Sequence, residues 1–142
     1  GKVGGQVLDL APPETATYGD VARMERMKTG ALFAFSCEAG PILGKAPVSA
    51  RAAMYAYAMD MGLAFQIADD LLDLEGDEAA LGKRVGKDEE AGKVTAITIL
   101  GAGEARMKAR VLLDQALGHL AGFGEEAEPL RLAAIFAVER KA

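Results

Sequence analysis

The stretch FQIADDLLDLEGD, residues 65–77, places three carboxylates inside an otherwise apolar helical pattern. Burying unpaired charge in such surroundings is costly, so these aspartates are candidates for a purpose other than solubility. Residues three and four apart are neighbours on a helix, so Gln66, Asp69 and Asp73 are expected on one face. Asp70 is displaced from that face by about 100°. Mg²⁺ prefers a few carboxylates, retained water and substrate phosphates to a closed protein cage. The stretch therefore predicts a helix that grips a diphosphate through magnesium.

Composition narrows the class of protein. The chain has 142 residues, of which 51% are hydrophobic and 26% charged, as expected for one folded domain rather than a disordered segment. The formal net charge of −5 disfavours a general nucleic-acid binder. No uninterrupted apolar run approaches the length of a membrane span.

Cysteine and histidine are each present once. Cys37 cannot form an internal disulfide, which favours a reducing, cytoplasmic setting. His119 is the only histidine, so a zinc site of several histidines and cysteines is excluded.

Helical periodicity, punctuated by Pro and Gly, predicts an all-α helix bundle. Gly40-Pro41 should break a helix, and Ser49 is a candidate N-cap for a long helix that ends near Leu74. A charged, glycine-punctuated loop is expected at 75–92. The expected helices are 1–9, 19–39, 49–74, 95–100, 104–121 and 129–139, the last with Pro129 at its first position.

Basic residues follow the aspartates along the chain. Lys83, Arg84, Lys87 and Lys93 lie among glycines in the expected loop. Lysines neutralise phosphate oxygens as point charges, and glycines let a loop follow a substrate closely. Carboxylates for a metal and lysines for phosphate together are more specific than the aspartates alone.

Five runs in order and spacing resemble the trans-isoprenyl diphosphate synthases of the farnesyl or geranyl diphosphate synthase type. The runs are GGQVLDL at 4–10, KTGAL at 28–32, GLAFQ at 62–66 continuing to Asp77, LGKR at 81–84, and GKVT at 92–95. The first residues read like the middle of a protein, so the whole chain, 1–142, is expected to be the C-terminal part of a single all-α prenyltransferase domain. The implied fold is about half of an isoprenoid synthase helix bundle.

The resemblance implies a Mg²⁺-dependent prenyltransferase. In that family an allylic diphosphate, such as dimethylallyl or geranyl diphosphate, ionises, and the cation alkylates isopentenyl diphosphate with loss of a proton. The roles implied for this chain are metal binding by Asp69, Asp70 and Asp73, diphosphate binding by Lys28, Lys83 and Lys93, and contact with the developing cation by Thr29 and Gln66. Phe65 would line the same pocket, and Arg140 and Lys141 resemble the family's basic C-terminus. Homodimers are usual in the family.

Two other classes remain open. A truncated homologue could be a non-catalytic regulatory or structural subunit, although intact metal and lysine motifs have no use in a scaffold. A related terpenoid cyclase is the third reading, against which the lysine loop and the Gly-Gly-Gln run favour chain elongation.

The chain by itself is expected to be inactive. Asp69-Asp70 is its only Asp-Asp pair, and nothing in it matches the family's first aspartate-rich motif. When the purified chain is incubated with an allylic diphosphate and isopentenyl diphosphate, no elongated diphosphate should form, unless a partner supplies the other half of the site. Detectable condensation by the chain alone would contradict this expectation.

Overall fold

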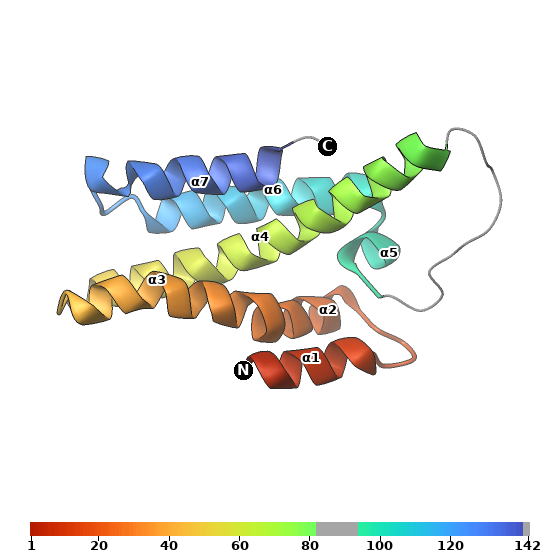
Figure 1. Ribbon diagram of the computed structural model, residues 1–142, viewed down its shortest axis with the longest axis horizontal. Coiled ribbons are helices and arrows are strands. Elements are labelled where there is room, and N and C mark those ends of the chain that lie inside the picture. The colour runs from red at the N-terminus through yellow and green to blue at the C-terminus, as the bar shows by residue number, and fades with distance from the viewer. Residues whose placement is uncertain (82–93, 141–142) are drawn as a thin grey trace.

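The computed structural model describes the backbone of residues 1–81 and 94–140 and the side chains of residues 1–76 and 94–140. Within these ranges the chain forms helices and no strand, which confirms the all-α prediction. The helices, shown in Figure 1, are α1 (Lys2–Leu10), α2 (Tyr18–Glu25), η1 (Arg26–Gly30), α3 (Ala31–Leu43), α4 (Val48–Leu81), α5 (Ala96–Leu100), α6 (Ala102–His119), η2 (Glu125–Ala127) and α7 (Glu128–Glu139). None of the helices in the described ranges is both long and apolar enough to cross a membrane.

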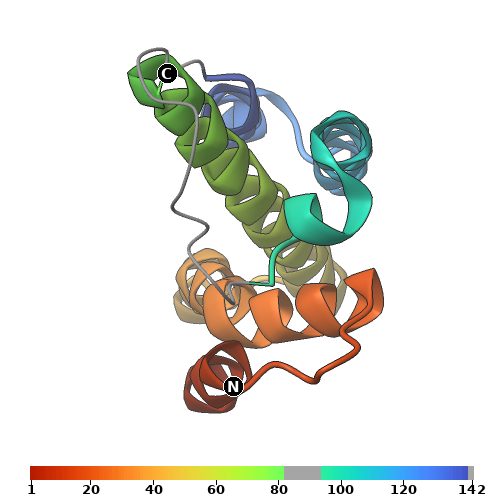
Figure 2. The same cartoon turned by 90° about the vertical axis from the view of Figure 1, so that its right-hand side faces the viewer.

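The long helix α4 runs through the middle of the molecule. On one side it packs against α6 and α7, and on the other against α3 and η1, while α1 lies outermost beside η1 (Figures 1 and 2). Contacts with α2, η1, α3, α5, α6 and α7 make α4 the central element, and α1 joins the bundle through η1 and α2. A residue on α4 can therefore meet partners from either end of the chain.

Two groups of buried side chains hold the layers together. Leu63, Ile67 and Leu71 recur every four residues along α4 and are buried with Leu112 of α6. Nearer the start of α4, Met54, Tyr57 and Met61 are buried with residues of α6 and α7. Burying a side chain such as Ile67 stabilises the fold by roughly 1.5–3 kcal/mol. The apolar stripe fixes the rotation of α4 and so decides which way its polar residues face.

Some predicted boundaries differ from the structure. The helix does not break at Gly40-Pro41: Pro41 lies in the last turn of α3, where the ring removes one hydrogen bond only, and the Gly40 carbonyl still accepts from Gly44. Ser49 is not the N-cap, because α4 already begins at Val48. Residues 75–81, expected as loop, continue α4. The short helix after Thr95 is confirmed, with Thr95 capping it through the backbone of Thr98.

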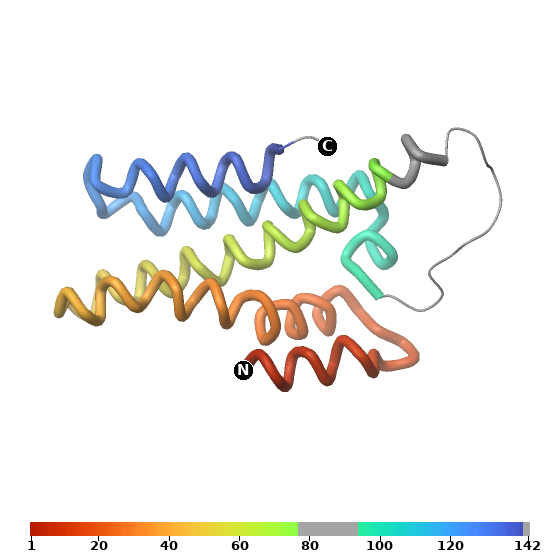
Figure 3. The backbone as a smooth tube through the Cα atoms, in the orientation of Figure 1, coloured from red at the N-terminus to blue at the C-terminus, as the bar shows by residue number. Residues whose placement is uncertain are grey.

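The stretch expected as one helix over 19–39 is a continuous path with a π-helical turn in the middle. Figure 3 shows α2, η1 and α3 following one another along one side of the molecule. A π-turn is costly within an α-helix and often marks a functional site. Here the π-turn carries Lys28 and Thr29, two of the site residues that the sequence predicts.

Glycines allow η1 to approach its neighbours closely. A Cβ at Gly5 of α1 would lie 2.4 Å from the backbone nitrogen of Lys28. A Cβ at Gly62 of α4 would lie 3.0 Å from the Cα of Gly30. Backbone atoms cannot move aside as a flexible side chain can, so the contact at Gly5 requires glycine, and a Cβ at Gly62 would be tighter than ordinary packing allows without a small shift.

We predict that Gly5→Ala destabilises the chain by about 1–3 kcal/mol, because the added methyl forces α1 away from η1. Gly118→Ala is the matched control: its Cβ meets nothing within 4 Å, and it should stabilise α6 by about 0.5–1 kcal/mol. Urea unfolding of the three proteins measures both changes. Equal stability of Gly5→Ala and the parent chain would contradict this account of the α1–η1 contact.

Candidate active site

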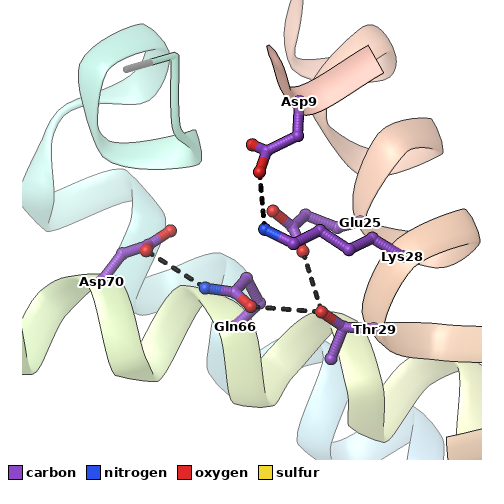
Figure 4. A network of polar contacts seen from close by, with 6 residues as sticks. All are labelled: Asp9, Glu25, Lys28, Thr29, Gln66 and Asp70. Carbon is purple, nitrogen blue, oxygen red and sulfur yellow. Dashed lines mark hydrogen bonds and ion pairs between the residues drawn. The ribbon is translucent and has the colours of Figure 1, made fainter. Parts of the chain in front are cut away.

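Polar side chains from three elements converge where α1, η1 and α4 meet. Figure 4 shows Lys28 and Thr29 of η1 pointing toward Gln66 of α4, with Asp9 of α1 above Lys28. Lys28, Thr29 and Gln66 are half-buried. The structure thus brings together residues that lie 37 positions apart in the sequence.

A hydrogen-bonded series runs from Glu25 at the end of α2 through η1 to α4. The Thr29 hydroxyl oxygen lies 3.2 Å from Glu25 Oε2 and 3.3 Å from Gln66 Oε1. The Gln66 amide nitrogen in turn donates to Asp70 Oδ1 at 3.2 Å. Asp70 is displaced from Asp69, as predicted, but it is nevertheless a neighbour of Gln66, because the two residues are four apart on the helix.

Lys28 is held by an ion pair with Asp9. Its Nζ donates to Asp9 Oδ2 at 2.7 Å, and both side chains are mostly shielded from solvent. The hydrogen bond to Asp9 raises the pKa of the Lys28 ammonium, with smaller contributions in the same direction from Glu25 and Asp70 and a partial loss from burial. Lys28 is thus a fully charged cation fixed in place beside Thr29.

Glu25 is a site residue that the sequence reasoning missed. Among the described side chains, Glu25 is the one charged residue that is buried, with 7% of its surface exposed. Burial raises the pKa of its carboxyl, while Lys28 opposes that shift and the nearby Asp70 adds to it. A signal was present: Glu25 lies four residues after buried Val21 and four before Thr29, on one stripe of the helix.

Asp69 faces the other way, toward the end of α7. Its Oδ1 accepts from the Arg140 guanidinium at 2.9 Å. Arg140 also lies over the ring of Phe65, 5.0 Å from the ring centroid, and Phe65 packs against Phe33 with 5.6 Å between centroids. Among the predicted site residues whose side chains the structure describes, Asp73 is the exposed one. The three aspartates therefore lie on one turn of α4 but do not share one set of partners.

The predicted lysines of the following loop lie outside the described residues. This applies to Lys83 and Lys93, and also to Arg84, Lys87 and Lys141. Their approach to the aspartates stays a prediction.

The donor set suits a metal that is shared with a substrate. Within residues 1–76 and 94–140, no three His, Cys, Asp or Glu side chains are gathered as a ready-made cage. Mg²⁺ does not need one, since one or two carboxylates plus substrate phosphates and water complete its shell. The half-buried Asp69 and Asp70 and the exposed Asp73 offer oxygen ligands only, as that ion prefers.

The sequence matches a known family over most of its length. The family model described as Polyprenyl synthetase matches residues 2–130. Farnesyl diphosphate synthase of Escherichia coli (strain K12) is 41% identical over 128 residues, which are 89% of this chain and 43% of that protein. Dimethylallyltranstransferase of Fischerella ambigua is 38% identical, over 99% of this chain and 41% of that protein. The chain spans less than half the length of these curated relatives.

Solved structures show the same arrangement of helices. An FPP/GFPP synthase from Zymomonas mobilis, in its apo form, superposes with a TM-score of 0.82 at 44% identity, covering 97% of this chain and 45% of that one. A decaprenyl diphosphate synthase from Rhodobacter capsulatus gives 0.81 at 28% identity, over 99% and 56% of the two chains. The bundle is therefore about half of the isoprenoid synthase fold, as predicted.

We predict that Asp9→Asn lowers the pKa of Lys28, because it removes the carboxylate that holds the ammonium. The ion pair contributes about 1 kcal/mol of stability. With the folded-state pKa of Lys28 raised above 10.5, that contribution is complete at neutral pH and is lost as pH rises through the folded value. NMR titration of the Lys28 Nζ resonance measures the shift. Asp114→Asn, on an exposed position of α6, is the control, and an unchanged Lys28 titration in Asp9→Asn would refute the assignment.

Proposed function

Because the chain belongs to the polyprenyl synthetase family, we propose that it carries the diphosphate-binding part of a trans-prenyl diphosphate synthase. The reaction joins an allylic diphosphate, such as dimethylallyl or geranyl diphosphate, to isopentenyl diphosphate. The bond between the allylic carbon and its diphosphate oxygen breaks, and the electron pair leaves with the diphosphate. The allylic carbon then bonds to the terminal alkene carbon of isopentenyl diphosphate, and a proton is lost. The product is a longer linear diphosphate.

The observation that carries the proposal is the meeting of η1 and α4. A fixed cation, Lys28 of η1, and the oxygen ligands of Asp70 on α4 lie at this junction, where Thr29 contacts Gln66 and Gln66 contacts Asp70 (Figure 4). A departing diphosphate needs positive charge where its negative charge develops. A developing carbocation needs dipoles near it that are poor nucleophiles, and a hydroxyl and an amide satisfy that condition.

We assign each residue one task. Lys28 contacts the diphosphate of the allylic substrate, and Lys83 and Lys93 supply further cations to the same group. Thr29 and Gln66 direct their oxygens at the developing cation. Asp69, Asp70 and Asp73 hold Mg²⁺, which when bound neutralises charge on the leaving diphosphate.

Other features complete the proposal. Residues 1–142 would form part of one prenyltransferase domain whose remaining portion supplies a second metal-binding motif. A homodimer and a cytoplasmic location belong to the same proposal. Apolar side chains on α1 and α3 support an assembly, because Val3, Val7, Phe35 and Leu43 are more than half exposed.

The two alternative functions, a terpenoid cyclase and a non-catalytic subunit, differ from chain elongation in their product or in diphosphate binding. A terpenoid cyclase would convert an allylic diphosphate into a cyclic hydrocarbon, whereas chain elongation gives a longer linear diphosphate. A non-catalytic subunit would bind no diphosphate at this site.

We predict that the chain binds inorganic pyrophosphate in the presence of Mg²⁺ and that Asp69→Asn weakens this binding by about 10- to 100-fold. That range corresponds to one lost charge-assisted contact of roughly 1.5–3 kcal/mol. Lys28→Ala should weaken it to a similar extent. Isothermal titration calorimetry with and without Mg²⁺ measures the affinities.

Asp114→Asn serves as the control, because it changes the net charge by the same amount at an exposed position of α6. It should bind like the parent chain. Equal affinity in Asp69→Asn, Asp114→Asn and the parent, or binding indifferent to Mg²⁺, would rule out the proposed metal–diphosphate site.

A further inference from the structure

The Thr29 hydroxyl lies between two oxygen atoms that ordinarily accept hydrogen bonds. Glu25 Oε2 is 3.2 Å away on one side and Gln66 Oε1 is 3.3 Å away on the other. A hydroxyl has one proton to donate and accepts through its lone pairs. One of the two contacts therefore needs a proton that Thr29 does not supply.

The orientation of Gln66 decides which contact that is. Its amide nitrogen donates to Asp70 Oδ1 at 3.2 Å, because an ionised carboxylate only accepts. The amide oxygen then faces Thr29 and can only accept as well. The Thr29 proton is thus required by Gln66, and Glu25 must supply the proton for its own contact with Thr29.

We propose that Glu25 is held as the neutral carboxylic acid and donates to Thr29, so that Thr29 donates to Gln66 and Gln66 to Asp70. The series then runs in one direction, from Glu25 at the end of α2 through Thr29 of η1 to Gln66 and Asp70 of α4; Figure 4 shows the four residues. Glu25 acts as a positioning residue: it fixes the direction of the Thr29 and Gln66 dipoles. That these dipoles face a developing cation rests on the proposed function, whereas the proton count rests on the hydrogen-bond geometry alone.

The surroundings of Glu25 favour the neutral form. Its side chain is buried, and no ion pair to it is formed among the residues with described side chains, since Lys28 is paired with Asp9 instead. The charged groups that face it from the packed elements are Lys28 on η1, Asp9 on α1 and Asp70 on α4, and α5 has no ionisable side chain. Burial raises the pKa of Glu25, and Asp70 and Asp9 add to that shift, which together outweigh the lowering by Lys28 and by the contact with Thr29.

If Glu25 ionised, the series would reverse or break. A Glu25 carboxylate would take the Thr29 proton, and the Thr29 oxygen would then face the Gln66 carbonyl oxygen with no hydrogen between them. The link between η1 and α4 would lose its hydrogen bond. The neutral form of Glu25 therefore preserves the hydrogen bond between η1 and α4 and fixes its direction.

The test measures the protonation of Glu25 in the 142-residue chain. Carbon-13 NMR of its side-chain carboxyl, assigned by loss of the signal in Glu25→Gln, should show the neutral acid above pH 4.5, the ordinary pKa of this group. A carboxylate signal that titrates at or below 4.5 overturns the proposal.

Two variants give an independent readout. Glu25→Gln keeps a donor for Thr29 but cannot ionise, and Glu25→Met keeps the length but removes the donor. The Gln66 side-chain amide resonances should stay near their parent positions in Glu25→Gln and move in Glu25→Met. Movement of equal size in both variants contradicts a donor role for Glu25.

The pH dependence of unfolding distinguishes protonation from packing. Because the folded-state pKa of Glu25 is raised, the folded chain binds its proton more tightly than the unfolded chain, and stability decreases as pH rises from 4.5 through the folded value. Within that window the parent's unfolding equilibrium constant should increase by up to about tenfold per pH unit relative to that of Glu25→Gln. Glu14→Gln, at an exposed position, should follow the parent chain. Identical profiles for the parent and Glu25→Gln overturn the proposal.

None of these three readouts requires diphosphate binding, so they can fail or succeed separately from the proposed function.

Discussion

Backbone contact at glycine is the constraint on which the candidate site depends. Where η1 crosses α4, a Cβ at Gly62 would lie 3.0 Å from Gly30, and where η1 meets α1, a Cβ at Gly5 would overlap the backbone of Lys28. One helical turn after each of these glycines comes a polar residue that reaches η1: Gln66 follows Gly62, and Asp9 follows Gly5. Each bridge has one short side chain, Asp9 opposite Lys28 and Thr29 opposite Gln66, and the close backbones bring these short side chains within reach of their partners. The glycines therefore set the spacing of the polar network as well as the packing.

The described part of the site contains more acid than base. Asp9, Glu25 and Asp70 surround one lysine, Lys28, and Asp69 has one arginine as its partner. A bare diphosphate would add negative charge to a region that already has an excess of it. A divalent cation or the lysines of the following loop would offset that excess, and both enter the proposed function. Holding one acid neutral, as inferred for Glu25, reduces the same excess from within the protein.

Periodicity predicted the helices well because apolar side chains must recur every three or four residues to reach a common core. It failed where single residues, rather than a stripe of apolar residues, determine where a helix ends or changes its geometry. Pro41 was expected to stop a helix, but a proline in the last turn costs one hydrogen bond and the helix ends shortly afterwards. The π-turn of η1 leaves the apolar pattern continuous, so no periodicity could reveal it. Gln66 and Thr29 could be predicted as site residues because they belong to recognisable runs, whereas Glu25 belongs to none and becomes visible only through its burial.

Neighbouring aspartates on a helix cannot share one environment, because successive side chains point about 100° apart. Asp70 is turned toward η1 and is joined to it through Gln66, while Asp69 is turned toward the end of α7 and pairs with Arg140. A cation bound by Asp69 Oδ1 must displace the Arg140 guanidinium or share the carboxylate with it. Arg140 also lies over Phe65, so its displacement would uncover that ring. The Asp-Asp pair thus connects the polar network at η1 with the C-terminal end of the bundle, and a ligand at the carboxylates is coupled to both.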